Sequence, residues 1–97
     1  MKAIELELIP TSKRKSFYGK AKVLYVPEIN ENYLKSYNTI IASVDSQFNI
    51  HRHSNYYSAT TNQHVKSFLQ NYMKKPIETK EFWGLPCESY ESISVKY

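Results

Sequence analysis

The first half of the chain alternates between apolar and polar residues in short runs, a pattern typical of half-buried β-strands. Residues 4–8 alternate isoleucine and leucine with glutamate until Pro10 ends the run. A second run spans residues 17–26. A third, over residues 33–44, is the richest in β-branched and aromatic residues. Each of these runs predicts one strand.

Three shorter segments extend this β pattern. Residues 48–53 resume the alternation after a polar turn at 45–47, so we expect them to form a hairpin with the preceding run. Residues 56–59 are interpreted as a short strand that leads into a helix. At the end of the chain, the alternation within residues 90–97 predicts an edge strand.

A helix is predicted after the short segment 56–59, because the spacing between apolar residues changes there from two positions to three or four. Thr60 is interpreted as its N-cap, with Gln63 in the capping-box position. The residues of the apolar stripe are Val65, Phe68, Leu69, Tyr72 and Met73. Two lysines, at 74–75, suit the last turn of the helix, and Pro76 prevents its continuation.

A second, short helix is predicted from Thr79 as its cap to Trp83, closed by Gly84 and Pro86. The elements together predict an α+β fold: a small antiparallel sheet of three to five strands, packed by one main helix and this short C-terminal helix. A chain of 97 residues has room for one domain, which we assign to residues 1–97.

Composition excludes several classes of protein. Two glycines are too few for most phosphate-cradling loops, and a single cysteine, Cys87, cannot form an internal disulfide. The N-terminal run is interrupted by glutamates, unlike the apolar core of a signal peptide, and no apolar run is long enough for a membrane span. We therefore expect a cytoplasmic protein that does not contact the membrane.

No set of residues predicts catalysis. Asp45 is the only aspartate and lies in a predicted turn, and the glutamates are scattered over predicted loops and helix ends. Cys87 stands next to a glutamate, which disfavours its thiolate form. We therefore predict no enzymatic activity, no catalytic residue and no cofactor.

The three histidines raise the question of a metal site. His51 and His53 would share one face of a strand, and His64 near the start of the helix would be a third ligand. The intervening Arg52 points to the other face and is taken as uninformative. A zinc site normally has three or four protein ligands at a recognisable spacing, which is not found here. We predict no metal and leave the roles of these histidines open.

Positive charge is concentrated near the N-terminus, with no acidic residue between Glu7 and Glu28, and the net charge is +4. Cations interleaved with aromatic rings are typical of surfaces that bind single-stranded nucleic acid, although a solvated loop and a polar strand face would look the same. The residues proposed for this surface are Lys13, Arg14, Lys15, Tyr18, Lys20 and Lys22.

Tyrosine is the most unusual feature of the composition, with nine residues in the chain. A small core has difficulty burying so many hydroxyl groups, and exposed tyrosines are typical anchors of protein interfaces. Half-buried positions on the sheet would explain some of them equally well. The tyrosines proposed as binding residues are Tyr33, Tyr37, Tyr56 and Tyr57.

Four blocks of sequence, residues 16–21, 36–42, 57–69 and 83–86, occur in the order found in a known family. They resemble a small uncharacterised domain of phages, prophages and other mobile elements of Gram-positive bacteria. The resemblance implies an accessory protein in the bacterial cytoplasm that is a monomer or small homo-oligomer and binds a host protein. The partner we expect is a nucleic-acid-handling defence complex, with the chain acting as an inhibitor of a defence nuclease, of the anti-CRISPR type. The alternative is a small basic protein that binds nucleic acid directly.

Overall fold

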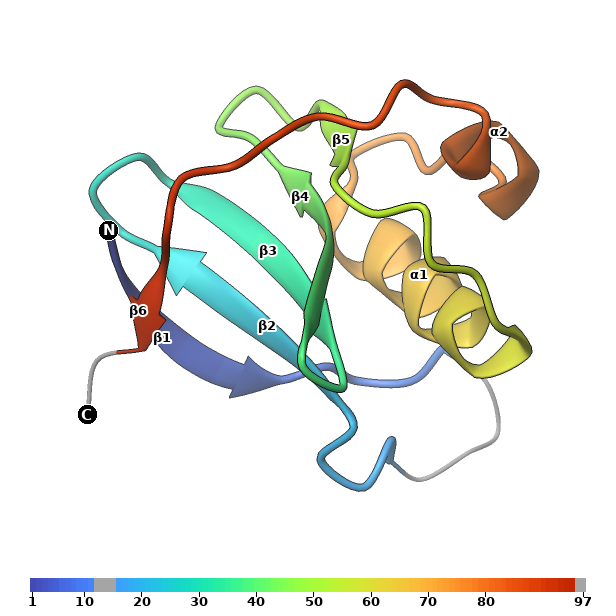
Figure 1. The fold of residues 1–97 in the computed structure, drawn as a ribbon, viewed down its shortest axis with the longest axis horizontal. Coiled ribbons are helices and arrows are strands. Elements are labelled where there is room, and N and C mark those ends of the chain that lie inside the picture. Colours follow the sequence, from blue (N-terminus) through green and yellow to red (C-terminus); the bar gives the residue numbers. More distant parts are fainter. Residues whose placement is uncertain (12–15, 96–97) are drawn as a thin grey trace.

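A six-stranded sheet with two helices forms the fold in a computed structural model, which describes residues 1–11 and 16–95 (Figure 1). The strands lie in the order β5-β4-β3-β2-β1-β6, and all neighbours are antiparallel except β1 and β6. The elements are β1 Lys2–Glu7, β2 Ala21–Val26, β3 Glu31–Ser36, β4 Thr39–Val44, β5 Ile50–Arg52, α1 Ala59–Tyr72, α2 Thr79–Trp83 and β6 Ser94–Val95. The predicted α+β fold is confirmed, but the expected three to five strands were too few.

The count was too low because residues 33–44 form a hairpin and not one strand. β3 and β4 pair directly, with Tyr33 opposite Ser43 and Ser36 opposite Thr39. The chain reverses at residues 37–38, where neither glycine nor proline marks a turn. The strong β-propensity of this run therefore concealed the reversal.

Two other strand predictions needed correction. β2 begins at Ala21 and not at residue 17, because residues 17–20 form a turn in which Lys20 N–H donates to the Phe17 carbonyl oxygen at 3.0 Å. Residues 56–59 are not a strand. The β4–β5 hairpin and an edge strand near the C-terminus, β6, are confirmed; residues 96–97 lie outside the described residues.

The helices have the predicted positions but different caps. Ser58, not Thr60, caps α1: its side chain accepts a hydrogen bond from Thr61 N–H at 3.0 Å. α1 ends at Tyr72, so the lysines at 74–75 follow the helix and do not lie in its last turn. In α2, Thr79 is the first helical residue, and Glu78 occupies the cap position without a side-chain hydrogen bond.

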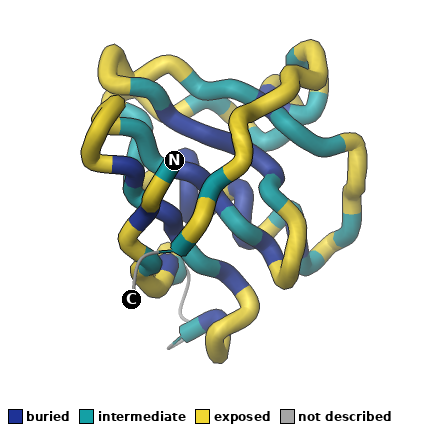
Figure 2. Tube along the Cα trace, turned by 60° about the vertical axis from the view of Figure 1, so that its left-hand side comes forward, coloured by how far each residue is buried: buried dark blue, intermediate teal, exposed yellow. Residues whose placement is uncertain are grey.

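The main core lies between α1 and one face of the sheet. Val65, Phe68 and Leu69 of α1 are buried, whereas Tyr72 is only half-buried. They meet a layer from the central strands that includes Val23, Leu34, Ile41, Ala42 and Val44. Figure 2 shows buried positions as dark-blue stretches along the chain, separated by exposed segments. The predicted apolar stripe therefore faces the sheet as expected.

The C-terminal segment, residues 86–95, crosses from α2 to the far edge of the sheet (Figure 1). Ile93 and Val95 pack against a second, smaller cluster that includes Leu24 and Tyr33. Ser94 N–H donates to the Met1 carbonyl oxygen at 2.8 Å, which joins the two ends of the chain. Neither helix in the described part of the chain has the length and apolar character needed to cross a bilayer.

Candidate functional site

Three of the four blocks that carry the resemblance meet at one end of the sheet, the lower end in Figure 1. The turn at 17–20 leads into β2, the turn at 37–38 joins β3 to β4, and residues 58–64 open α1. The Tyr37 backbone N–H donates to the Lys20 carbonyl oxygen at 2.7 Å, so the two turns are tied together. Segments far apart in the sequence thus form one surface, which we call the turn surface.

A buried polar network supports the turn surface from inside. The Ser36 hydroxyl lies 2.8 Å from His64 Nδ1 and 3.3 Å from the Thr61 hydroxyl. The Ser58 hydroxyl in turn donates to the Thr61 hydroxyl at 3.0 Å. Because Ser36 ends β3 and the other residues open α1, this network fixes the strand against the helix.

His64 is the centre of this network. Its ring lies edge-on to Phe17, with centroids 4.7 Å apart, and is tilted against Tyr37 at 5.9 Å. It is therefore in contact with all three segments of the turn surface. Phe17, which precedes exposed Tyr18 in the chain, is buried against this ring.

Ser36 and His64 have the separation of a serine nucleophile and its base. Ser36 is 2% exposed and His64 is 0% exposed, so a substrate cannot approach the hydroxyl in this conformation. The pair therefore acts as a structural hydrogen bond between β3 and α1.

Two tyrosines project from the turn surface in an unusual backbone conformation. Tyr18 and Tyr37 have φ angles of 53° and 54°, and their exposed fractions are 75% and 48%. Left-handed backbone disfavours a residue with a side chain by about 1–2 kcal/mol. A glycine adopts this backbone conformation without strain, and Gly19, next to Tyr18, does so at a φ of 75°. Backbone strain often marks functional sites, and here two strained, exposed rings lie on turns that hydrogen-bond to each other.

The sequence model of a family of unknown function (DUF8033) matches residues 4–84. The chain belongs to this family. No curated protein and no solved structure has a significant match to the chain. The match to DUF8033 extends from β1 through α2, so it includes the whole turn surface but not the C-terminal segment.

Only some of the predicted binding residues come together on this DUF8033 domain. Tyr18, Lys20 and Tyr37 are exposed on the turn surface. Lys13, Arg14 and Lys15 lie outside the described residues. The Lys22 ammonium forms an ion pair with Glu7, which raises the lysine pKa and offsets its charge with that of the carboxylate.

The other predicted tyrosines lie elsewhere. Tyr33 is buried, contrary to its assignment as an exposed interface residue, because the C-terminal segment covers its face of the sheet. Its ring lies 6.3 Å from that of Tyr90 in this segment. Tyr56 and Tyr57 are exposed, but they precede α1, and Tyr57 packs edge-on against Trp83 at 5.3 Å. The four tyrosines proposed as binding residues therefore do not share one surface.

The histidines form no shared centre. Both nitrogens of His51 bind carboxylates, Asp45 and Glu88, each at 2.9 Å, and His53 Nδ1 lies 2.9 Å from the Glu88 carbonyl oxygen. His64 lies in the main core on α1 and is not a third ligand beside them. Within residues 1–11 and 16–95, no group of three or more His, Cys, Asp or Glu side chains is placed to hold a metal. His51 in β5 and His53 directly after it both contact Glu88 and so attach the C-terminal segment to this edge of the sheet.

The His51 bridge predicts that stability depends on pH. Burial alone lowers the His51 pKa, but hydrogen bonds and charge from Asp45 and Glu88 outweigh it and raise the pKa above its ordinary value. A raised histidine pKa stabilises the folded state most below about pH 6.5, and this contribution is lost as pH rises through the raised value. We expect urea denaturation to show that Glu88→Gln, which removes one partner charge, reduces the difference in unfolding free energy between about pH 6 and pH 8.5.

The exposed ion-paired carboxylate Glu7 provides the matched control for this prediction. Glu7→Gln should leave the pH difference at its wild-type size, because lysine stays protonated across this range. An unchanged pH difference in Glu88→Gln would show that the bridge does not contribute.

Proposed function

We propose that this DUF8033 domain is a non-enzymatic accessory protein of a phage or mobile element that binds a host protein through its turn surface. The observation that carries the proposal is the pair Tyr18 and Tyr37, both exposed and both held on left-handed backbone by turns that hydrogen-bond to each other. Exposed tyrosines on rigid turns lose little entropy on binding and are frequent hot spots of protein interfaces.

The family resemblance and the charge narrow the partner. A net charge of +4 and an exposed Lys20 favour a partner with an acidic patch or with bound nucleic acid. We infer that the partner is a nucleic-acid-handling defence complex in the bacterial cytoplasm, and that the domain inhibits its nuclease by stoichiometric contact.

Direct binding of nucleic acid is the second candidate function. Tyr18 beside Lys20, following the basic residues 13–15 in sequence, combines rings with positive charge. The ion pair between Lys22 and Glu7 counts against it, because a carboxylate offsets one of the cations of the expected stripe. A surface of this kind would bind with a steep dependence on salt.

The double variant Tyr18→Ala/Tyr37→Ala tests the protein-binding proposal. In nuclease-treated lysate of a bacterial host, we expect the wild-type domain to capture a protein partner. Against the purified partner, the double variant should dissociate at least about 30-fold faster, the effect of losing a hot spot worth about 2 kcal/mol. Surface plasmon resonance measures this rate, and the melting temperature confirms that the variant is folded.

Phe48 offers a closely matched control. It is 50% exposed, has a φ of 67° and lies in the turn between β4 and β5, at the opposite end of β4. Phe48→Ala should leave the dissociation rate unchanged. An equal effect of both variants would contradict a specific role for the turn surface.

Charge reversal at Lys13 and Lys15 separates the two candidate functions. For a protein interface, Lys13→Glu/Lys15→Glu should mainly slow association, by an amount that shrinks as salt rises. If this variant abolishes binding while the tyrosine variant has no effect, and the captured material is removed by nuclease, the domain is a nucleic-acid binder and the protein-binding proposal is wrong.

A further inference from the structure

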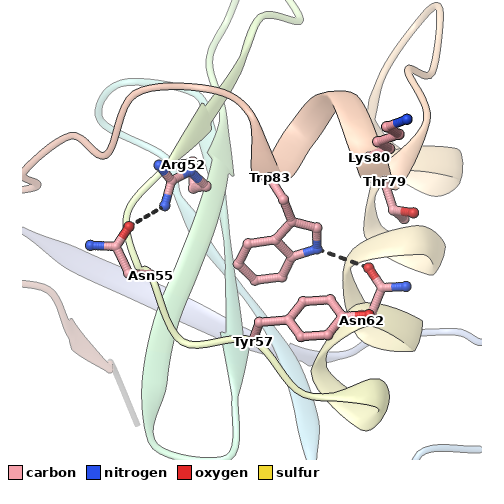
Figure 3. A pocket seen from close by; sticks show the side chains of 7 residues that line it. All are labelled: Arg52, Asn55, Tyr57, Asn62, Thr79, Lys80 and Trp83. Atoms are coloured by element: carbon pink, nitrogen blue, oxygen red, sulfur yellow. Dashed lines mark hydrogen bonds between the residues drawn. The ribbon is translucent and has the colours of Figure 1, made fainter.

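A cleft of about 500 Å³ opens beside α2, and neither of the turns at 17–20 and 37–38 contributes to its lining (Figure 3). Arg52 and Asn55 line it on one side and Thr79 and Lys80 on the other, with the indole ring of Trp83 between them. Its volume is in the range of sites that bind small organic molecules.

The indole ring is held in a fixed orientation. Trp83 Nε1–H donates to Asn62 Oδ1 at 2.8 Å, and the Tyr57 ring meets the indole edge-on at an interplanar angle of 82°. On its inner side the indole packs against the buried Phe82, with centroids 5.0 Å apart. The cleft thus presents a preorganised aromatic ring on which a planar ligand can stack.

Arg52 places a buried positive charge in the wall of the cleft. It is 8% exposed, and its guanidinium donates to the Leu85 and Ser54 carbonyl oxygens, both at 2.8 Å, and to Asn55 Oδ1 at 2.7 Å. All these acceptors are neutral, and in the part of the chain that the structure describes no carboxylate lies within ion-pair distance of Arg52. Buried charges are usually paired, so this one favours an anion in the cleft.

The remaining polar groups that line the cleft are mainly donors. Asn55 and Asn62 each use Oδ1 as an acceptor within the protein, which leaves their amide NH₂ groups for a ligand. Lys80 is exposed and forms no ion pair with any residue in 1–11 or 16–95. Among the described residues that line the cleft there is no carboxylate. Such a lining recognises a ligand rich in acceptor oxygens.

We propose that this cleft binds a nucleotide, either free or as the end of a nucleic-acid strand. The base stacks on Trp83, and the phosphate lies in the field of Arg52 and Lys80, which flank the indole. The cleft shares Asn62 with the α1 segment of the turn surface, but none of the residues in the turns at 17–20 and 37–38 lines it, so either proposal can fail without the other. Arg52, taken as uninformative from the sequence, becomes the buried charge of this site.

Trp83 is the only tryptophan in the chain, so its fluorescence reports directly on the cleft. We expect adenosine and uridine monophosphates to change its emission saturably at submillimolar to millimolar concentrations. Lys80→Gln should weaken this binding about fivefold, the upper range for an exposed ion pair. Lys75→Gln, which removes an exposed lysine outside the cleft, should leave the affinity unchanged.

A 5′-phosphorylated trinucleotide distinguishes the two sources of ligand: tighter binding than the monophosphate indicates a strand end, and equal binding a free nucleotide. Both results support the site. No saturable change with any nucleotide would overturn the proposal. So would equal weakening by Lys75→Gln and Lys80→Gln, or binding of inorganic phosphate or the unphosphorylated nucleoside as tight as that of the nucleotide.

Discussion

Truncating Phe68 to alanine is expected to lower the free energy of unfolding by about 3–5 kcal/mol. Phe68 is among the largest fully buried side chains, packs between α1 and the sheet, and lies 5.1 Å from the Tyr72 ring. Stability of single domains is about 5–15 kcal/mol, so this loss is a large share of the total. Thermal denaturation should show a melting temperature lower by roughly 4–8 °C for each kcal/mol.

Gln70→Ala is the control, because Gln70 lies on the exposed side of the same helix. Its effect should stay within about 0.5 kcal/mol. A Phe68→Ala protein with the wild-type melting temperature would mean that α1 does not pack on the sheet through this face.

The position of α1 and the face it buries were predictable, because both follow from local periodicity. Val65, Phe68 and Leu69 repeat at the spacing of one helical face, and this face has to be buried in a small domain. The alternation of apolar and polar residues, which is equally local, predicted β1 and the pairing of β4 with β5. These features depend on the order of apolar and polar residues and not on distant contacts.

The cap of α1 could not be predicted from local sequence. Ser58, Thr60 and Thr61 are all good caps, so the choice among them depends on tertiary structure. Thr61 is drawn into the buried network with Ser36, 25 residues away, and this places Ser58 at the helix start. A local rule contains no information about that contact.

The candidate site was predictable only in part, for the same reason. Tyr18 and Tyr37 were identified from composition, but the left-handed backbone that distinguishes them from buried Tyr33 arises where two turns meet. Arg52 is held in the wall of the cleft by a hydrogen bond to the Leu85 carbonyl oxygen, 33 residues away, which no local pattern reveals. His64 did carry a local signal: it lies four residues before Phe68, on the helix face predicted to be buried.

Replacing His64 with alanine is expected to destabilise the fold by about 2–4 kcal/mol, through lost packing and the broken hydrogen bond to Ser36. The ring is completely buried against Phe17, and its removal takes from Ser36 a partner at 2.8 Å in a region that water does not reach. Because His64 joins all three segments of the turn surface, partner binding should weaken as well. Urea denaturation measures the stability, and the dissociation rate measures the effect on the surface.

His64→Asn separates the hydrogen bond from the packing, because an asparagine amide can reach the position of the imidazole Nδ1. We expect it to lose less stability than His64→Ala. The double variant Ser36→Ala/His64→Ala should be less destabilised than the sum of the two single variants, because each single change already breaks their shared hydrogen bond. Additive effects in this cycle, or a His64→Ala protein as stable as wild type, would show that the network does not hold β3 against α1. The turn surface would then need another explanation for its strained tyrosines.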